Sequence, residues 1–367
     1  MALAAVKTFV TGEVLYAADL NSLNTNILNN SLSLISPLTG NLNANSKQLT
    51  NLLLEVLTAN PTAANAGRVF YNSTDDQVGY DNGSRTRQIP MLGKNLLING
   101  DFRVWQRGIA FTNTTTPANN DDTYLADRWI FLADGADACD VSREIVTVPT
   151  GSWSAILLDV ESNNRKFGIL QVIEQKDAVR VIGGRASFQF KARVTGASLT
   201  ALRAAILSWS GGADAVTSDV VSAWAAAGTD PTLAANWTYE NVPTNLAMTT
   251  SYQTFRIENI AIDTASTTNV AVFIWQDLTT TTVGDFAYIT DVQLEVGRAC
   301  TDFDVRPFAI EEALSQRFAW SKTPGTAKSL GEGSANTTTA WQASHAFPCT
   351  MRVAPTLTVD DQTRFAV

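Results

Sequence analysis

The sequence predicts a mainly β protein: a short N-terminal helix or coiled coil and a β-rich stalk, then a jelly-roll-like antiparallel β-sandwich and a small C-terminal β module. Short segments with period-two alternation recur from residue 94 onward, which is typical of antiparallel strands. The first 66 residues have no tryptophan and only two cations, so they form a different part of the chain. We expect four parts, at residues 1–36, 37–94, 95–310 and 311–367.

The composition excludes several classes of function. With 26 Lys+Arg against 35 Asp+Glu, the net charge of −9 argues against nucleic-acid binding, which needs clustered cations. No apolar run approaches the roughly 18 residues of a membrane span, and the N-terminus lacks a secretory signal, so we expect no membrane insertion. His345 is the single histidine, and Cys139, Cys300 and Cys349 lie far apart, so we expect buried free thiols, no metal centre and no cofactor.

Residues 1–36 carry an apolar seam with the 3-4-3-4 spacing of a coiled coil and an asparagine at a core position. Its members are Leu20, Leu23, Ile27, Asn30 and Leu34. Two heptads are too short to hold alone in water, so the helix packs either on its own chain or against copies of itself. Because residues 1–66 offer no aromatic core to pack against, the seam favours copies.

Residues 37–94 predict a β-rich stalk. Pro37 and Gly40 end the helix, and the alternating residues after them predict a short hairpin or a strand wrapped about an axis. Residues 67–90 predict a three-stranded meander, with the Asn82–Gly83 pair as a type I′ turn. A sheet this small is not stable alone, so both N-terminal parts point to a stalk made of several chains.

Residues 95–310 predict one large sandwich with a single helical segment at 218–228. The expected strands are 96–106, 124–132, 141–148, 154–161, 167–174, 184–194, 203–210, 252–262, 268–276 and 285–296.

Two of these strands show the alternation most clearly. Phe188, Phe190, Ala192 and Val194 oppose Gln189, Lys191 and Arg193, while Val270, Val272 and Ile274 oppose Ala271, Phe273 and Trp275. We expect a core that contains Trp105, Trp129, Trp275, Phe188, Phe190 and Ile274.

Residues 311–367 predict a connector and the start of a β tip. Residues 309–320 predict a short helix or an extended connector, and the rest holds about three strands without a compact core. The chain ends in an apparent strand, so we expect that a further piece is missing or that neighbouring chains complete the tip.

Several stretches carry a resemblance to a known family. KNLLINGDFRVWQRG (94–108), YLADRWIF (124–131) and ITDVQLEVGRACTDFDVRPFAIEEALSQRF (289–318) resemble a β-sandwich domain common in bacteriophage tail fibres and related receptor-binding proteins. GEVLYAADLNSLNTNI and GRVFYNSTDDQVGYDNGSRTRQI resemble the N-termini and stalk modules of such fibres. The resemblance covers most of the chain in collinear order; the insert at 209–245 and the C-terminus depart from it.

This resemblance implies a homotrimer in the virion tail, made in the host cytoplasm. It also implies that tail or baseplate proteins hold the N-terminus. Because the family's sandwich resembles carbohydrate-binding modules, it suggests that host surface polysaccharide or lipopolysaccharide is a partner.

Glycan binding needs aromatic faces beside hydrogen-bonding side chains. The glycan-binding candidates are Trp209, Trp224, Trp237 and Tyr239, in a segment rich in Asn, Asp and Thr, and Trp341 near the tip. The alternative is that the first four pack the insert against the sandwich.

No catalytic residue is expected. The pairs Asp121–Asp122, Asp159/Glu161 and Asp302/Asp304 are spaced as acid pairs, but nothing in the sequence around them marks a cleft. Acids with backbone carbonyls can hold a structural Ca²⁺, yet no loop has EF-hand spacing.

Four functions therefore compete. The favoured one is a non-catalytic, trimeric tail fibre or fibre-like appendage that attaches a phage to host glycans. The alternatives are a glycan-cleaving tail depolymerase, or a structural adaptor fibre that carries another receptor-binding subunit. A bacterial surface adhesin or secreted carbohydrate-binding protein is disfavoured by the missing signal peptide.

Overall fold

The computed structural model describes residues 54–62, 66–74, 77–84, 86–88, 93–321, 332–335, 341–344 and 346–356. The proposed seam at Leu20, Leu23, Ile27, Asn30 and Leu34 and the hairpin after Gly40 lie outside these residues. Within the described part, no helix is both long enough and apolar enough to cross a membrane.

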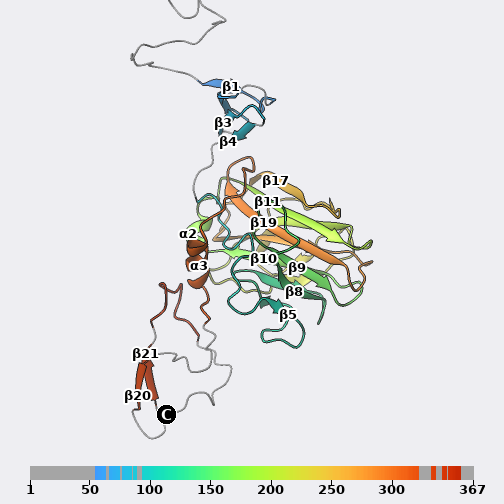
Figure 1. Ribbon diagram of the computed structural model, residues 1–367, viewed down its shortest axis with the longest axis vertical. Helices are drawn as coiled ribbons and strands as arrows, with labels where there is room; N and C mark the ends of the chain where they lie inside the picture. The colour runs from blue at the N-terminus through green and yellow to red at the C-terminus, as the bar shows by residue number, and fades with distance from the viewer. Residues whose placement is uncertain are drawn as a thin grey trace, which may run out of the picture. The chain divides into compact units, whose positions relative to one another are not determined.

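Two antiparallel sheets form the predicted β-sandwich (Figure 1). The six-stranded sheet has the order β17 (Gln253–Ala261), β11 (Arg185–Thr195), β19 (Phe286–Val296), β9 (Ala155–Val160), β8 (Cys139–Glu144), β5 (Ala110–Phe111). The other sheet has the order β15 (Trp237–Tyr239), β12 (Ala201–Trp209), β18 (Asn269–Gln276), β10 (Phe167–Ile173), β7 (Ile130–Ala133), β6 (Thr123–Tyr124), with β16 (Leu246–Ala247) also paired to β12.

The described residues also form smaller elements before, between and after the sandwich strands. They are the sheet of β1 (Glu55–Leu57), β2 (Val69–Asn72), β3 (Gln77–Asp81) and β4 (Thr86–Gln88), the pair β13 (Val221–Ala223) and β14 (Thr232–Leu233), the pair β20 (Glu332–Ala335) and β21 (Trp341–Ser344), and the helices α2 (Gln175–Ala178) and α3 (Phe308–Gln316).

The inward faces of the two sheets form one inter-sheet core. Trp105, Trp129, Phe188, Phe190 and Ile274 all belong to it, as the sequence predicts. Trp129 is 1% exposed, and its indole Nε1 donates to the Asn99 carbonyl at 2.9 Å. The alternation on β11 is the reason that this strand forms, because Phe188, Phe190, Ala192 and Val194 all reach the same core.

The second sheet is buried on both faces. On β18, Val270, Val272 and Ile274 face the inter-sheet core, while Ala271, Phe273 and Trp275 face a second cluster. The insert at 209–245 supplies the other side of this cluster, through Trp209, Val220, Val221 and Trp237. We call this insert the cover and the second cluster the cover core. Trp275 is therefore buried, but beneath the cover rather than between the sheets.

Three sequence predictions in the sandwich are wrong. Residues 124–132 are not one strand, because the backbone turns at Arg128, which has φ of 74°, so that β6 and β7 pair antiparallel. Residues 96–106 are not a strand, because the backbone turns at Asn99 and Phe102, which have φ of 58° and 52°. Their apolar alternation comes from a buried coil. Residues 218–228 are not a helix but contain β13, since Val220 and Val221 bury against the sheet below and this packing overrides the helical preference of the alanines.

The meander and the connector helix are confirmed, with differences in detail. β3 pairs antiparallel with β2 and with β4, the Asn82–Gly83 pair lies between β3 and β4, and β1 pairs parallel with β2. Phe70 is buried whereas Val69 is 44% exposed. The sequence does not decide which face of this strand is buried, because the apolar residues here are consecutive. Of the two alternatives for residues 309–320, the short helix is confirmed: α3 begins one residue earlier, at Phe308, and ends at Gln316.

Candidate functional site

The outward face of the six-stranded sheet presents two rows of side chains across four neighbouring strands. Alternate residues of β11, β19, β9 and β8 enter the inter-sheet core, so those between them point away from it. Strand register aligns one row as Arg193, Tyr288, Leu157 and Ser142, and the next as Thr195, Phe286, Asp159 and Asp140. We call these eight residues, together with Tyr252, the open face.

An arginine and three aromatic rings form the centre of the open face. The Arg193 guanidinium carbon lies 5.1 Å from the Tyr288 ring centroid and 5.9 Å from that of Tyr252. The ring of Phe286 follows, 6.4 Å from that of Tyr288 and inclined at 42°. The Tyr252 hydroxyl donates to the Thr147 carbonyl at 2.7 Å, which fixes that ring. All four side chains are half-buried, so each still offers some surface to a ligand.

Arg193 is a cation without a carboxylate partner in the described part of the chain. Its Nε and the Thr195 hydroxyl are enclosed by protein, yet neither has a hydrogen-bond partner among the described residues. Lys191, two residues earlier on the same strand, instead forms an ion pair with Asp291 at 2.7 Å. The open face therefore holds a guanidinium that pairs with no carboxylate of the described residues and lies beside aromatic rings, an arrangement suited to hydroxyl-rich or acidic ligands.

Burial sets the protonation of the open face. It raises the pKa of Tyr252 and Tyr288, so both phenols stay neutral at physiological pH. Burial raises the pKa of Asp140 to about 6, and repulsion by Glu161, Asp137 and Asp159 adds to the effect. The pKa of Asp159 is raised for the same reasons, by burial first and then by Glu161.

The acid pairs considered from the sequence differ in the contacts that their members make. Asp121 accepts a hydrogen bond from the Ala133 amide at 2.8 Å, so it supports the strand β7. Asp159 lies directly opposite Asp140 on the neighbouring strand, a pairing that sequence spacing did not reveal. Across the described residues, no group of three or more His, Cys, Asp or Glu side chains is placed to hold a metal ion.

Two of the predicted glycan-binding tryptophans are in fact packed inside the cover core, which is a correction. Trp209 and Trp237 are 7% and 6% exposed, and their ring centroids lie 5.3 Å apart. Neither has a free face on which a sugar can stack. They are buried because the outer face of β18 is apolar and needs a partner layer.

The other predicted residues keep some exposure or are described less fully. Trp224 and Tyr239 are half-buried against the cover core, and the Tyr239 hydroxyl donates to the Pro231 carbonyl at 2.8 Å. Trp341 begins β21, which is described by its backbone alone. The glycan role of these three residues stays a prediction.

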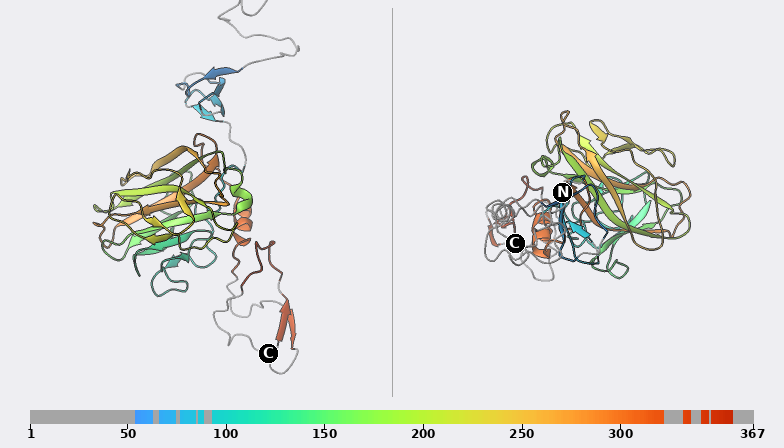
Figure 2. Two further views of the ribbon diagram at one scale, coloured as in Figure 1. Left: turned by 180° about the vertical axis from the view of Figure 1, so that it is seen from behind. Right: turned by 90° about the horizontal axis from the view of Figure 1, so that it is seen from above.

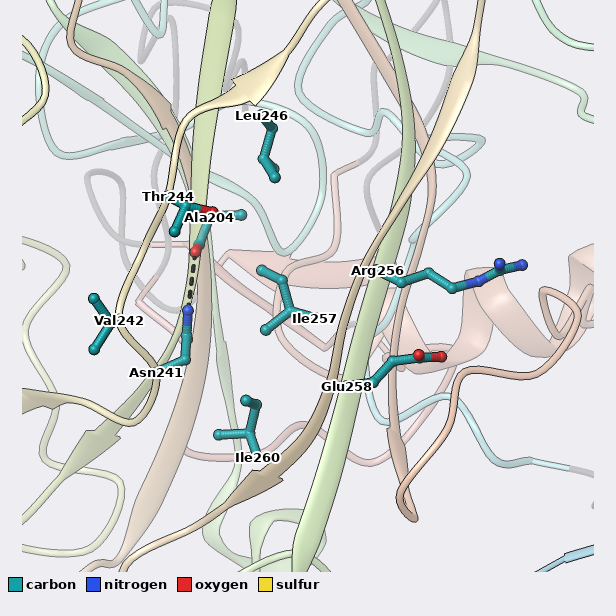
Figure 3. A pocket seen from close by; sticks show the side chains of 9 residues that line it. All are labelled: Ala204, Asn241, Val242, Thr244, Leu246, Arg256, Ile257, Glu258 and Ile260. Carbon is teal, nitrogen blue, oxygen red and sulfur yellow. Dashed lines mark hydrogen bonds between the residues drawn. The ribbon is translucent and has the colours of Figure 1, made fainter. Parts of the chain in front are cut away.

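A cavity of about 340 Å³ lies between β12, residues 241–246 at the end of the cover, and β17 (Figure 3). Ile257 and Ile260 point into it, whereas Arg256 and Glu258 point away. The Asn241 side chain forms two hydrogen bonds with the backbone of β12. Its amide nitrogen donates to the Ala204 carbonyl, and its amide oxygen accepts from the Ile206 N–H. Aromatic side chains are missing from the lining, so the cavity suits sugar stacking less well than the open face.

Comparisons with known proteins give a likeness of fold. No family model and no curated protein matches the chain. The enzymatically active domain of bacteriophage CBA120 tailspike protein 4 is 12% identical with a TM-score of 0.30, over 51% of this chain and 21% of that one. A carbohydrate-binding module of family 4 is 13% identical with a TM-score of 0.30, over 54% of this chain and 97% of the module.

The CBM22-1 xylan-binding domain from Paenibacillus barcinonensis is 9% identical with a TM-score of 0.30, over 58% of this chain and all of that domain. This chain therefore spans about a fifth of the tailspike domain and nearly all of the two modules. At these identities and TM-scores, the likeness assigns no function to this chain.

Proposed function

We propose that this protein is a non-catalytic, homotrimeric tail fibre or fibre-like appendage of a bacteriophage, which attaches the particle to host surface polysaccharide or lipopolysaccharide through the open face. Tail or baseplate proteins hold its N-terminus, and it is made in the host cytoplasm. The observation that carries the glycan part is the cluster of Arg193, Tyr252, Tyr288 and Phe286 on an uncovered sheet face.

The chemistry of this cluster matches what a sugar chain offers. The C–H faces of a pyranose stack on aromatic rings, and its hydroxyls accept from nearby donors. Tyr288 and Phe286 supply the rings, while Arg193 supplies a guanidinium that pairs with no carboxylate among the residues that the structure describes. Each site binds weakly, but three linked sites raise the effective concentration and give strong attachment in sum.

Polysaccharide binding by the full chain tests this proposal. Tyr288→Ala removes the central ring and is expected to weaken binding of host polysaccharide about tenfold. Tyr124→Ala is the matched control, because Tyr124 on the other sheet also stands beside a guanidinium, that of Arg107 at 5.8 Å. Equal binding by both variants and the wild type would show that the open face is not the polysaccharide-binding site.

Two results would exclude the open face as the binding site, and each points to a different alternative. If the wild-type trimer binds no host polysaccharide and does not compete with particles for cells, the chain is a structural fibre that carries another receptor-binding subunit. If it binds but Tyr288→Ala has no effect, the ligand site lies elsewhere, with Trp224, Tyr239 and Trp341 as the remaining candidates.

A second candidate function, glycan cleavage, is favoured by one observation. Asp140 and Asp159 face each other on adjacent strands of the open face, and the pKa of Asp140 is about 6. A glycosidase needs two carboxylates, one of which is protonated near neutral pH. Release of reducing ends from host polysaccharide, abolished by Asp140→Asn, would establish this activity; intact polysaccharide after long incubation would support a binding protein.

A further inference from the structure

Three arginines surround the ring of Phe318, two residues after the end of α3. The guanidinium carbon of Arg128 lies 3.6 Å from the ring centroid, and those of Arg317 and Arg352 lie 5.9 Å and 5.8 Å from it. All four side chains are half-buried, so the group reaches the surface of the protein. We call Arg128, Arg317, Phe318 and Arg352 the arginine cluster.

Three separate segments of the chain form the arginine cluster. Arg128 lies in the turn between β6 and β7, and its guanidinium donates to the Val172 carbonyl of β10. The Arg352 backbone amide donates to the Arg317 carbonyl at 2.9 Å, which holds the later segment beside the end of α3. Figures 1 and 2 show α2 and α3 side by side, and Glu174, just before α2, forms an ion pair with Arg317 at 2.7 Å. Hydrogen bonds and an ion pair therefore hold the three segments together.

The arginine cluster carries more positive charge than the carboxylates around it neutralise. Arg317 pairs with Glu174, but neither Arg128 nor Arg352 pairs with a carboxylate among the residues that the structure describes. The Arg128 Nε is enclosed by protein and has no hydrogen-bond partner in that part of the chain. Two such guanidinium groups beside one ring are costly, because like charges repel and a buried cation loses its hydration. They lie in a protein whose net charge is −9, so the excess is local.

The electrostatics of Arg128 show the same excess. Burial lowers its pKa to about 10, and the positive charges of Arg352 and Arg107 add to the effect, while Tyr124 and Glu174 oppose it. This pKa is still far above neutral, so the guanidinium keeps its charge under physiological conditions. A bound anion would therefore stabilise the cluster.

We propose that the arginine cluster binds a phosphate group, either carried by a sugar or present as the free ion. The planar fork of a guanidinium matches the spacing of phosphate oxygens. Two guanidinium groups without a carboxylate also match the charge of a phosphate monoester, which is about −1.5 to −2 at neutral pH. A carboxylate carries a single charge and would neutralise half of the excess. Arg128 adjoins β7, in the sheet opposite the open face, so this site is separate from the proposed glycan site.

Titration calorimetry of the full chain with inorganic phosphate tests the site. The wild type is expected to bind about one phosphate per chain, and Arg352→Gln to weaken this binding about tenfold, because charge-assisted hydrogen bonds are lost. Arg128→Lys keeps the charge but removes the planar fork, and as a second variant it is also expected to weaken binding. Arg185→Gln is the matched control and is expected to bind as the wild type does. Arg185 is exposed on β11, donates to the Asn259 carbonyl at 2.8 Å and likewise pairs with no carboxylate of the described residues.

A lipopolysaccharide with intact phosphates, and the same preparation after hydrogen fluoride has removed them, distinguish the two sources. Binding that falls on dephosphorylation in the wild type but not in Arg352→Gln would assign a sugar-borne phosphate. Binding of inorganic phosphate that depends on Arg352 would assign the free ion.

Two results would overturn the phosphate site. One is a wild type that binds no inorganic phosphate and binds both lipopolysaccharide preparations equally. The other is phosphate binding that Arg352→Gln, Arg128→Lys and Arg185→Gln weaken to the same extent, since the general positive charge would then be the cause. Tyr288→Ala is expected to leave phosphate binding unchanged, so a failure of the open face is distinguishable from a failure of this site.

Discussion

Arg193 and Lys191 show how two cations on one strand acquire different roles. Lys191 is neutralised by Asp291, whereas the Arg193 guanidinium lies close to two tyrosine rings and pairs with no carboxylate among the described residues. A guanidinium packed beside aromatic rings is already partly ordered, so little further side-chain entropy is lost when a ligand binds it. Under the proposed function, Arg193 is therefore the residue of this strand expected to contribute most to binding.

We predict that Arg193→Gln weakens polysaccharide binding about tenfold, because charge-assisted hydrogen bonds to the ligand are lost. Lys191→Gln is expected to change the dissociation constant by less than about twofold, since that ammonium is already paired. Titration calorimetry with the same polysaccharide measures both. Equal losses in the two variants would mean that only the general positive charge matters.

Asp140 gives the open face a pH dependence of stability. Its pKa in the folded protein, about 6, lies above that of an ordinary aspartate, so the folded state holds more protons between about pH 4 and pH 6. This contribution to stability is present below pH 4 and is lost as the pH rises through 6. The cost at pH 7 comes from burial and from repulsion by the neighbouring acids.

We therefore predict that Asp140→Asn stabilises the protein at pH 7.5 by up to about 1 kcal/mol, after allowance for solvent screening, or about 2–4 °C in melting temperature. The difference from wild type should vanish near pH 4. Thermal melts of both proteins at the two pH values provide the measurement. A variant that gains equally at pH 4 would show that the carboxylate charge is not the cause.

At the scale of elements, β18 explains both what the sequence reveals and what it hides. Alternation in β11, β18 and β19 predicts these strands to within about one residue, since period two is a local property. The same alternation shows that β18 is apolar on both faces, yet it does not say what covers the second face. The cover packs on this second face, and Trp209 and Trp237 are buried in that contact.

The open face escaped prediction because it is a product of register. Phe286 and Tyr288 alternate with Ala287 and Ile289, so their common face can be read locally. That Arg193, about a hundred residues earlier, lies opposite Tyr288 follows from the pairing of β11 with β19, which leaves no trace in a single sequence. Likewise, Asn99 and Phe102 break an apparent strand because their positive φ is decided by buried hydrogen bonds rather than by composition.

Trp129 is the anchor that links this coil to the sandwich. Its ring lies 5.0 Å from that of Phe102, and its indole bonds the Asn99 carbonyl. We predict that Trp129→Ala destabilises the protein by about 3–5 kcal/mol, through the cavity and the lost bond. Chemical denaturation followed by far-UV circular dichroism measures this cost. A loss below about 1 kcal/mol would mean that residues 96–106 hold their shape without it.

At the scale of the whole molecule, the chain divides its tasks between surfaces. One sheet is sealed by the cover, and the opposite sheet presents the open face. The proposed function places the ligand on the open face, whereas the sequence placed four of the five glycan-binding candidates in the cover.

Solvent labelling of the open face with and without host polysaccharide tests the central claim most directly. Hydroxyl-radical footprinting of the full chain reads Tyr252, Phe286 and Tyr288 together with Trp153, which is 70% exposed and lies outside the open face. We predict that saturating polysaccharide lowers labelling of the three open-face rings at least threefold and leaves Trp153 unchanged. Unchanged labelling of all three rings while the polysaccharide is bound would contradict the account.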